Sequence, residues 1–108
     1  MFNRVEIIGN VGAVPEVRIT DRREKITSFR VATNETWKDR EGKPVEKTEW
    51  HKVVAYKSLA NYCEKKLSKG SLVFIEGKLS NREWEKNGEK RITTEIIAFT
   101  VRVLKRGE

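Results

Sequence analysis

Residues 50–79 read WHKVVAYKSLANYCEKKLSKGSLVFIEGKL, and this stretch predicts a strand, a short helix and a second strand in immediate succession. Residues 50–56 alternate between two kinds of side chain, as a strand with two different faces does. Ser58 is placed to cap a helix that continues to about Lys69, and Ser71 to Leu79 follows as an apolar strand. The position of this helix between two strands is therefore the feature that decides which fold we predict for the whole chain.

Strand patterns lie on both sides of this stretch. Residues 3–9 and 14–20 are extended around a break at Gly9 and Gly12, and residues 26–56 form a long hairpin. After it, Asn87-Gly88 is a strong hairpin signal that joins residues 80–86 to residues 90–104. Three strands, one helix and two strands predict an all-β chain: a five-stranded Greek-key barrel of the OB type, with the helix between strands 3 and 4 and extended hairpins. Another small α+β sandwich is the alternative.

Length and charge bound the kind of protein. We expect the 108 residues to form one domain, spanning residues 1–108, with a single hydrophobic core. The net charge of +7 favours a polyanionic partner such as a nucleic acid. A basic protein without such a partner is the alternative.

The sequence lacks the residues that several classes of function require. One histidine and one cysteine cannot form a Cys/His metal cluster, and no glycine loop of a phosphate-binding type is present. We therefore expect no enzyme activity, no cofactor and no metal. With no signal peptide and no membrane-length apolar run, a cytoplasmic, nucleoid-associated protein without a membrane partner is expected. Cys63 is expected to be a buried thiol.

The two faces of residues 50–56 differ in chemistry. One parity is small and apolar apart from His51, as a barrel interior requires. The other carries two aromatic rings and a cation, and a core would not bury Lys52 without a partner. This second parity is expected to face solvent: Trp50, Lys52, Val54 and Tyr56. Packing of the two rings on a neighbouring subunit or loop is the alternative.

Two further tryptophans have cations beside them. Arg82, Trp84 and Lys86 share one parity of a segment with no aliphatic residue, which predicts a hairpin arm that projects into solvent. Trp37 precedes Lys38 and is expected to lie beyond the barrel, although a core position is the alternative. Tyr62 and the four phenylalanines are expected in the core. Exposed rings beside cations are what a protein needs to hold single-stranded nucleic acid without reading its sequence.

A set of motifs in a fixed order connects the chain with a known family. They are NRVEIIGNVG at 3–12, PEVR at 15–18, FRVATNETW at 29–37, TEWHKVVAY at 48–56, LSKGS at 67–71, VFIEGKL at 73–79 and REW at 82–84. In these motifs the chain resembles bacterial-type single-stranded DNA-binding proteins, from Asn3 to about Leu104. Each motif alone is weak, but their order and spacing are specific.

This resemblance implies an OB-fold protomer that assembles into a homotetramer, a dimer of dimers. It implies sequence-independent binding that protects single-stranded DNA in replication, recombination and repair. The stacking rings fall on Trp37, Trp50, Tyr56 and Trp84. The phosphate-contacting cations that the resemblance implies are Arg40, Lys52, Lys69 and Arg82. Lys38 and Lys86 are expected to join them, because they lie beside Trp37 and Trp84. The subunit interface is expected at Val5, Ile7 and His51.

The chain also departs from the family pattern. Ser58 and Ser68 occupy positions that are often basic, and Glu83 lies beside Trp84 where a basic or neutral residue is usual. The family commonly continues into a Gly-rich tail with an acidic tip that recruits replication and repair proteins. Such partners are expected here only if a tail exists beyond Glu108. A protein-interaction adaptor and an RNA-binding OB domain are the other hypotheses.

Overall fold

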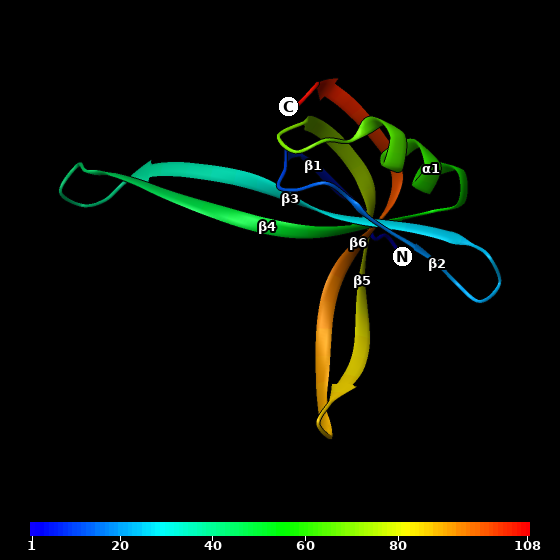
Figure 1. The fold of residues 1–108 in the computed structure, drawn as a ribbon. Helices are drawn as coiled ribbons and strands as arrows, with labels where there is room; N and C mark the ends of the chain where they lie inside the picture. The colour runs from blue at the N-terminus through cyan, green and yellow to red at the C-terminus, as the bar shows by residue number, and fades with distance from the viewer.

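The structure, a computed structural model, describes all of residues 1–108 and consists of six strands and one helix (Figure 1). None of its elements is a helix with the length and apolar character needed to cross a membrane. In chain order the elements are β1 (Val5–Val11), β2 (Glu16–Ile19), β3 (Lys25–Lys38), β4 (Pro44–Tyr56), α1 (Lys57–Lys66), β5 (Leu72–Lys86) and β6 (Glu89–Lys105).

The strands close into a barrel. Their order is β1-β5-β6-β4-β3-β2, and β1 closes the ring by pairing with β3 at Asn10–Ala32 and Val11–Val31. Neighbours are antiparallel except β4 and β6, which run parallel at Val53–Ile96. Because β1 and β2 both pair with β3, they share one of five strand positions. This is the expected five-stranded OB barrel, with α1 between the third and fourth positions.

The barrel interior is filled by apolar side chains from five strands, α1 and the residue that follows it. Val53 and Ala55 are fully buried, which confirms the inward parity predicted for this part of β4. The core cluster consists of Val11, Phe29, Val31, Val53, Ala55, Cys63, Leu67, Val73, Ile75, Ile96, Ala98 and Val101. Burial raises the pKa of the Cys63 thiol to about 12, so this group stays protonated at neutral pH.

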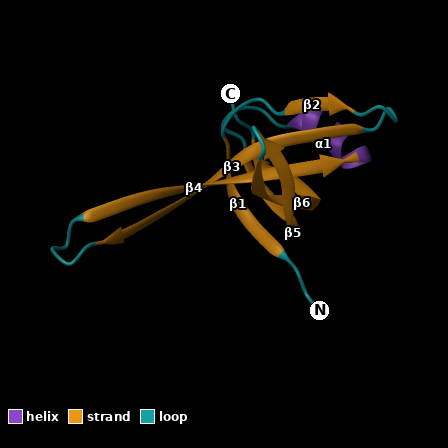
Figure 2. Cartoon of the chain, turned by 90° about the horizontal axis from the view of Figure 1, so that it is seen from below, coloured by secondary structure: helices purple, strands orange, loops and turns teal.

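Two hairpins leave the barrel as long arms. The β3–β4 arm pairs continuously out to Lys38–Pro44, and the β5–β6 arm out to Lys86–Glu89. Figures 1 and 2 show the β3–β4 arm leaving the barrel on the side opposite α1. Neither arm has an apolar core, and cross-strand hydrogen bonds hold them instead. Thr48 Oγ1 donates to Asn34 Oδ1 (2.8 Å), and Thr94 Oγ1 donates to Asn81 Oδ1 (2.9 Å).

The tip of the β5–β6 arm forms as the sequence predicts. Asn87 and Gly88 have φ of 54° and 80°, and the strands resume pairing at Lys86 and Glu89. A two-residue turn with both φ angles positive has the twist that antiparallel strands need, which explains why Asn-Gly is favoured there.

Predictions about element ends were partly wrong. Gly9 does not break the first strand: β1 continues through it to Val11, and a Cβ at this position would overlap the carbonyl oxygen of Ala32 in β3. Ser58 does not cap α1, which begins at Lys57 after an extended Tyr56 and has no side-chain cap. The helix also ends at Lys66, before the predicted Lys69.

Some burial predictions also failed. Phe2 and Phe99 are 79% and 57% exposed, so only part of the predicted phenylalanine core exists. Val54 is 5% exposed although it shares the parity of Trp50 and Tyr56. It lines a groove together with Val17, Ile26 and Glu95, which come from three other strands of the sheet.

Candidate nucleic-acid interface

Four aromatic rings are open to solvent. Trp37, Trp50, Tyr56 and Trp84 are 47%, 53%, 40% and 38% exposed. The core alternative for Trp37 is therefore wrong. They lie at separate places: Trp37 on the β3–β4 arm, Trp50 near its root, Tyr56 at the barrel end of β4 and Trp84 on the β5–β6 arm. Their exposure is as predicted, whereas their role in binding stays a prediction.

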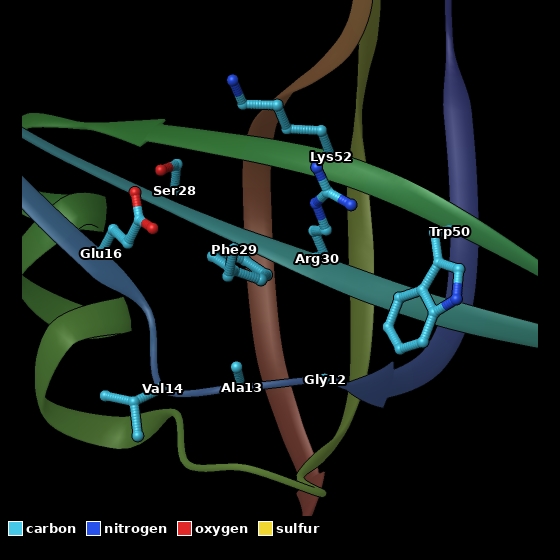
Figure 3. Close-up of a pocket in the computed structure, with 9 residues that line it drawn as sticks. All are labelled: Gly12, Ala13, Val14, Glu16, Ser28, Phe29, Arg30, Trp50 and Lys52. Atoms are coloured by element: carbon cyan, nitrogen blue, oxygen red, sulfur yellow. The ribbon is translucent and has the colours of Figure 1, made fainter.

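A groove of about 520 Å³ lies beside Trp50. Figure 3 shows the Trp50 ring at one end of the groove and Glu16 with Ser28 at the other. Gly12 lies directly against this ring, since a Cβ built there would be 2.5 Å from Cζ3 of Trp50. The glycine thus leaves room for the Cζ3–Cη2 edge of the indole against the backbone that follows β1.

Arg30 is a member of this groove that sequence reasoning did not single out. It is exposed and pairs in register with Lys52 across β3 and β4 (Figure 3). The sequence could have identified it: if the residues of the two strands are paired one by one starting from the hairpin turn, Arg30 falls opposite Lys52. The groove therefore combines a ring, two cations and the carboxylate of Glu16.

A second groove, of about 360 Å³, lies further along β4 toward Tyr56. It brings Lys52 from β4 and Arg82 from β5 to the same place as the Tyr56 ring. Both cations contact one carboxylate oxygen of Glu95 in β6: Lys52 Nζ at 3.0 Å and Arg82 Nε at 3.4 Å. Sequence reasoning missed Glu95, because a glutamate between Thr94 and Ile96 carries no signal of its partners on other strands.

The β5–β6 arm presents Trp84 with one edge fixed. Its Nε1 donates a hydrogen bond of 2.8 Å to Thr93 Oγ1 on the opposite strand. The indole is thereby oriented across the hairpin, and its polar edge is satisfied without water. Lys86 is exposed two residues further along the same strand. The arm therefore carries a pre-oriented ring and a cation beyond the second groove.

On the β3–β4 arm, Trp37 lies near the tip with Lys38, and Arg40 lies in the turn. Five residue pairs separate Trp37 from the position opposite Trp50, which is about 17 Å along a strand. Between them, Lys47 and Glu49 form an exposed ion pair of 2.9 Å. Its hydrogen bond raises the pKa of Lys47 and lowers the pKa of Glu49, so both remain charged.

Lys69 lies apart from both arms, in the loop between α1 and β5. The loop is tied to the end of β1, since Gly70 N donates to Val11 O at 2.8 Å and Asn10 Nδ2 donates to Gly70 O at 3.1 Å. These hydrogen bonds bring the loop that contains Lys69 close to the end of β1. Lys69 itself is not among the residues that line either groove.

The residues predicted for subunit contact are half-buried in this protomer. Val5 and Ile7 pack against the barrel core, whereas Ile8 on the other face of β1 is 57% exposed. His51 Nε2 is 2.8 Å from Thr33 Oγ1 on β3. Their place in an interface stays a prediction. No cluster of His, Cys, Asp and Glu side chains is arranged to hold a metal ion.

Comparison with known proteins places this geometry in a family. The model of the "Single-strand binding protein family" matches residues 2–104. The chain belongs to this family. It is 42% identical over 104 residues to a protein of Neisseria meningitidis serogroup B named "Single-stranded DNA-binding protein", with 95% of this chain and 60% of the relative aligned. It is 43% identical over 105 residues to "Single-stranded DNA-binding protein 1" of Xylella fastidiosa, covering 95% of this chain and 77% of that protein.

Solved structures of this family have the same fold. A protein of Plasmodium falciparum described as "SSB complex with ssDNA" superposes with a TM-score of 0.89 at 34% identity, covering 97% of this chain and 96% of the other. A deletion mutant of the single-stranded DNA binding protein of Thermus aquaticus gives 0.84 at 32% identity, with 96% of this chain and 51% of the other covered. The chain thus spans 60% of the Neisseria relatives and about half of the Thermus protein.

Proposed function

We propose that this chain binds single-stranded DNA without sequence preference, by stacking bases on exposed rings and holding the phosphates between them with cations. The observation that carries the proposal is the exposure of all four rings, at 38–53%, on the arms and barrel of one protomer. Membership of the family supports it, as does the fold shared with the Plasmodium protein described in complex with single-stranded DNA.

The arrangement of the rings favours unpaired strands. In a duplex the faces of the bases are covered by their neighbours, so a protein ring can stack only on a base that has been freed. Trp50 and Tyr56 lie at separate positions on β4 and Trp84 lies on β5, and grooves that contain Lys52 and Arg82 lie beside the two β4 rings. A flexible single strand can bend between such rings, whereas a stiff duplex cannot. Every base has a stacking face, so this mode is tolerant of sequence.

The cations predict a defined response to salt. Single-strand binding releases counterions, and the logarithm of the association constant falls with the logarithm of salt concentration by about 0.7 per neutralised phosphate. With three to six contacts from the cations named above, we expect a slope of about −2 to −4 for a short oligo(dT). Affinity measured by fluorescence anisotropy between low and moderate salt checks this. Binding that is insensitive to salt would contradict phosphate contacts.

The homotetramer is part of this proposal. From Val5 to Ile8, β1 pairs with β5 along one edge only, because its pairing with β3 is confined to Asn10 and Val11. An unpaired strand edge beside the exposed Ile8 is suited to pairing with a second copy. Light scattering at micromolar concentration should give four times the chain mass. A monomer in that measurement would contradict assembly but would leave single-strand binding open.

The proposed role is that of a binding protein rather than an enzyme, in the cytoplasm and on the nucleoid, where it protects single strands during replication, recombination and repair. Recruitment of replication and repair proteins is proposed only for a chain that carries an acidic tail after Glu108.

A further inference from the structure

Glu95 is an acidic residue in the middle of a surface that is proposed to bind a polyanion. Its side chain is 8% exposed, and one of its oxygens, Oε2, is shared by Lys52 Nζ at 3.0 Å and Arg82 Nε at 3.4 Å. The two cations themselves remain accessible, with 33% and 51% of their side chains exposed. The carboxylate therefore lies beneath the cations rather than between them and solvent.

The topology explains why one residue reaches both cations. In the sheet, β6 lies between β5 and β4. Glu95 pairs with Ser80 on β5, and the next residue, Ile96, pairs with Val53 on β4. Glu95 is thus at the point where β6 passes from the β5–β6 arm into the barrel. It connects the strand that carries Trp84 with the strand that carries Trp50 and Tyr56.

The contacting atoms leave binding capacity free. Arg82 meets Glu95 through Nε, so both terminal nitrogens of its guanidinium have no partner in this protomer. The ammonium group of Lys52 has three N–H donors, and its contact with Glu95 occupies one of them. A phosphate arriving from solvent can therefore bind both cations while the carboxylate still holds them from below, and the Tyr56 ring lines the same groove.

We propose that Glu95 is a positioning residue that holds Lys52 and Arg82 together as one phosphate clamp between the stacking rings. The inference rests on the proposed single-strand binding. It differs from simple charge balance in the sign of its effect. If Glu95 only added negative charge to the surface, its removal would strengthen binding to DNA. If it positions the clamp, its removal weakens binding, because two long side chains must then be ordered by the DNA alone.

The test is the variant Glu95→Gln, which keeps the size of the side chain and removes its charge. We expect its affinity for a short oligo(dT) to fall by about three- to tenfold, which is in the lower part of the range of coupling between groups of one ion-pair network. The matched control is Glu85→Gln on the exposed β5–β6 arm, where the carboxylate makes no ion pair. This control has the same change of charge and should bind equally or more tightly.

A double-mutant cycle separates positioning from a general loss of structure. In the parent, Lys52→Ala should weaken binding, whereas in the Glu95→Gln background the same change should cost at least threefold less. Thermal unfolding of each variant shows whether the barrel is intact. If Glu95 only stabilised the fold, Glu95→Gln would lower the melting temperature, but the effect of Lys52→Ala on DNA binding would stay the same in both backgrounds. Tighter binding by Glu95→Gln, or independent effects of the two substitutions, would overturn the proposal.

The outcomes also distinguish this inference from the proposed function. If the parent binds oligo(dT) and Glu95→Gln binds more tightly, positioning fails while single-strand binding stands. If the parent does not bind oligo(dT), the proposed function itself fails, and the clamp has no ligand.

Discussion

Replacing both Trp50 and Trp84 with alanine is expected to reduce affinity for single-stranded DNA by about 30-fold or more. Each stacked ring contributes roughly 1–3 kcal/mol per base, and the two rings lie on different arms without shared partners, so their effects should add. Equilibrium titration of oligo(dT) by anisotropy measures the change. The barrel should keep its stability, because neither ring belongs to the core cluster.

The matched controls are Trp50→Phe and Trp84→Phe, which keep a flat ring at each position. Trp84→Phe also removes the hydrogen bond to Thr93, so it separates stacking from anchoring of the indole edge. We expect the phenylalanine variants to retain most of the affinity. Alanine variants that bind like the parent would contradict stacking, and phenylalanine variants as weak as alanine would show that the indole hydrogen bond or shape matters instead.

The variant Gly77→Ala is expected to destabilise the protein by about 2–4 kcal/mol, as overpacking and backbone strain at a closely packed site do. Gly77 lies at an irregularity where β5 changes register against β6, between Glu76 and Gly77. A Cβ there would overlap the backbone carbonyl of Ile97, and backbone cannot move aside as a flexible side chain can. This bulge lies within the barrel, since Gly77 pairs with Ala98 of the core, and the arm begins further along at Ser80–Glu95. Chemical denaturation measures the loss.

Gly42→Ala serves as the comparison for Gly77→Ala. Gly42 has a φ of 81° and nothing within 4 Å of a Cβ, so its cost should be limited to about 1 kcal/mol of backbone strain. Equal effects of the two substitutions would show that the close approach of β6 at Gly77 is not limiting for stability.

The barrel could be predicted because its signals are local. The alternation along residues 50–56 and the Asn87-Gly88 turn each fix a strand from neighbours in sequence, and family motifs connect them. Gly9 and Ser58 were misjudged because their role is set from outside their own segment. Gly9 is required by the approach of β3, and the helix starts directly from the strand end at Tyr56.

The candidate site was predictable in its rings but not in its ion pairs. A tryptophan among charged residues on an arm is exposed whatever its partners are, so Trp84 could be read from parity alone. The network of Glu95 with Lys52 and Arg82 depends on β6 lying between two strands that are distant in sequence. Such order in a sheet follows from closure of the barrel, which no local pattern specifies.

The central claim is that the exposed rings of this chain stack on unpaired bases of DNA, and tryptophan fluorescence titrated with strands of equal length tests it most directly. With single-stranded DNA, we expect strong quenching and tight binding, because indoles stacked on bases lose emission. Matched duplex should cause little quenching and bind far more weakly, and matched RNA should compete poorly. Equal binding of duplex and single strand, or binding of the single strand with unchanged emission, would contradict the account.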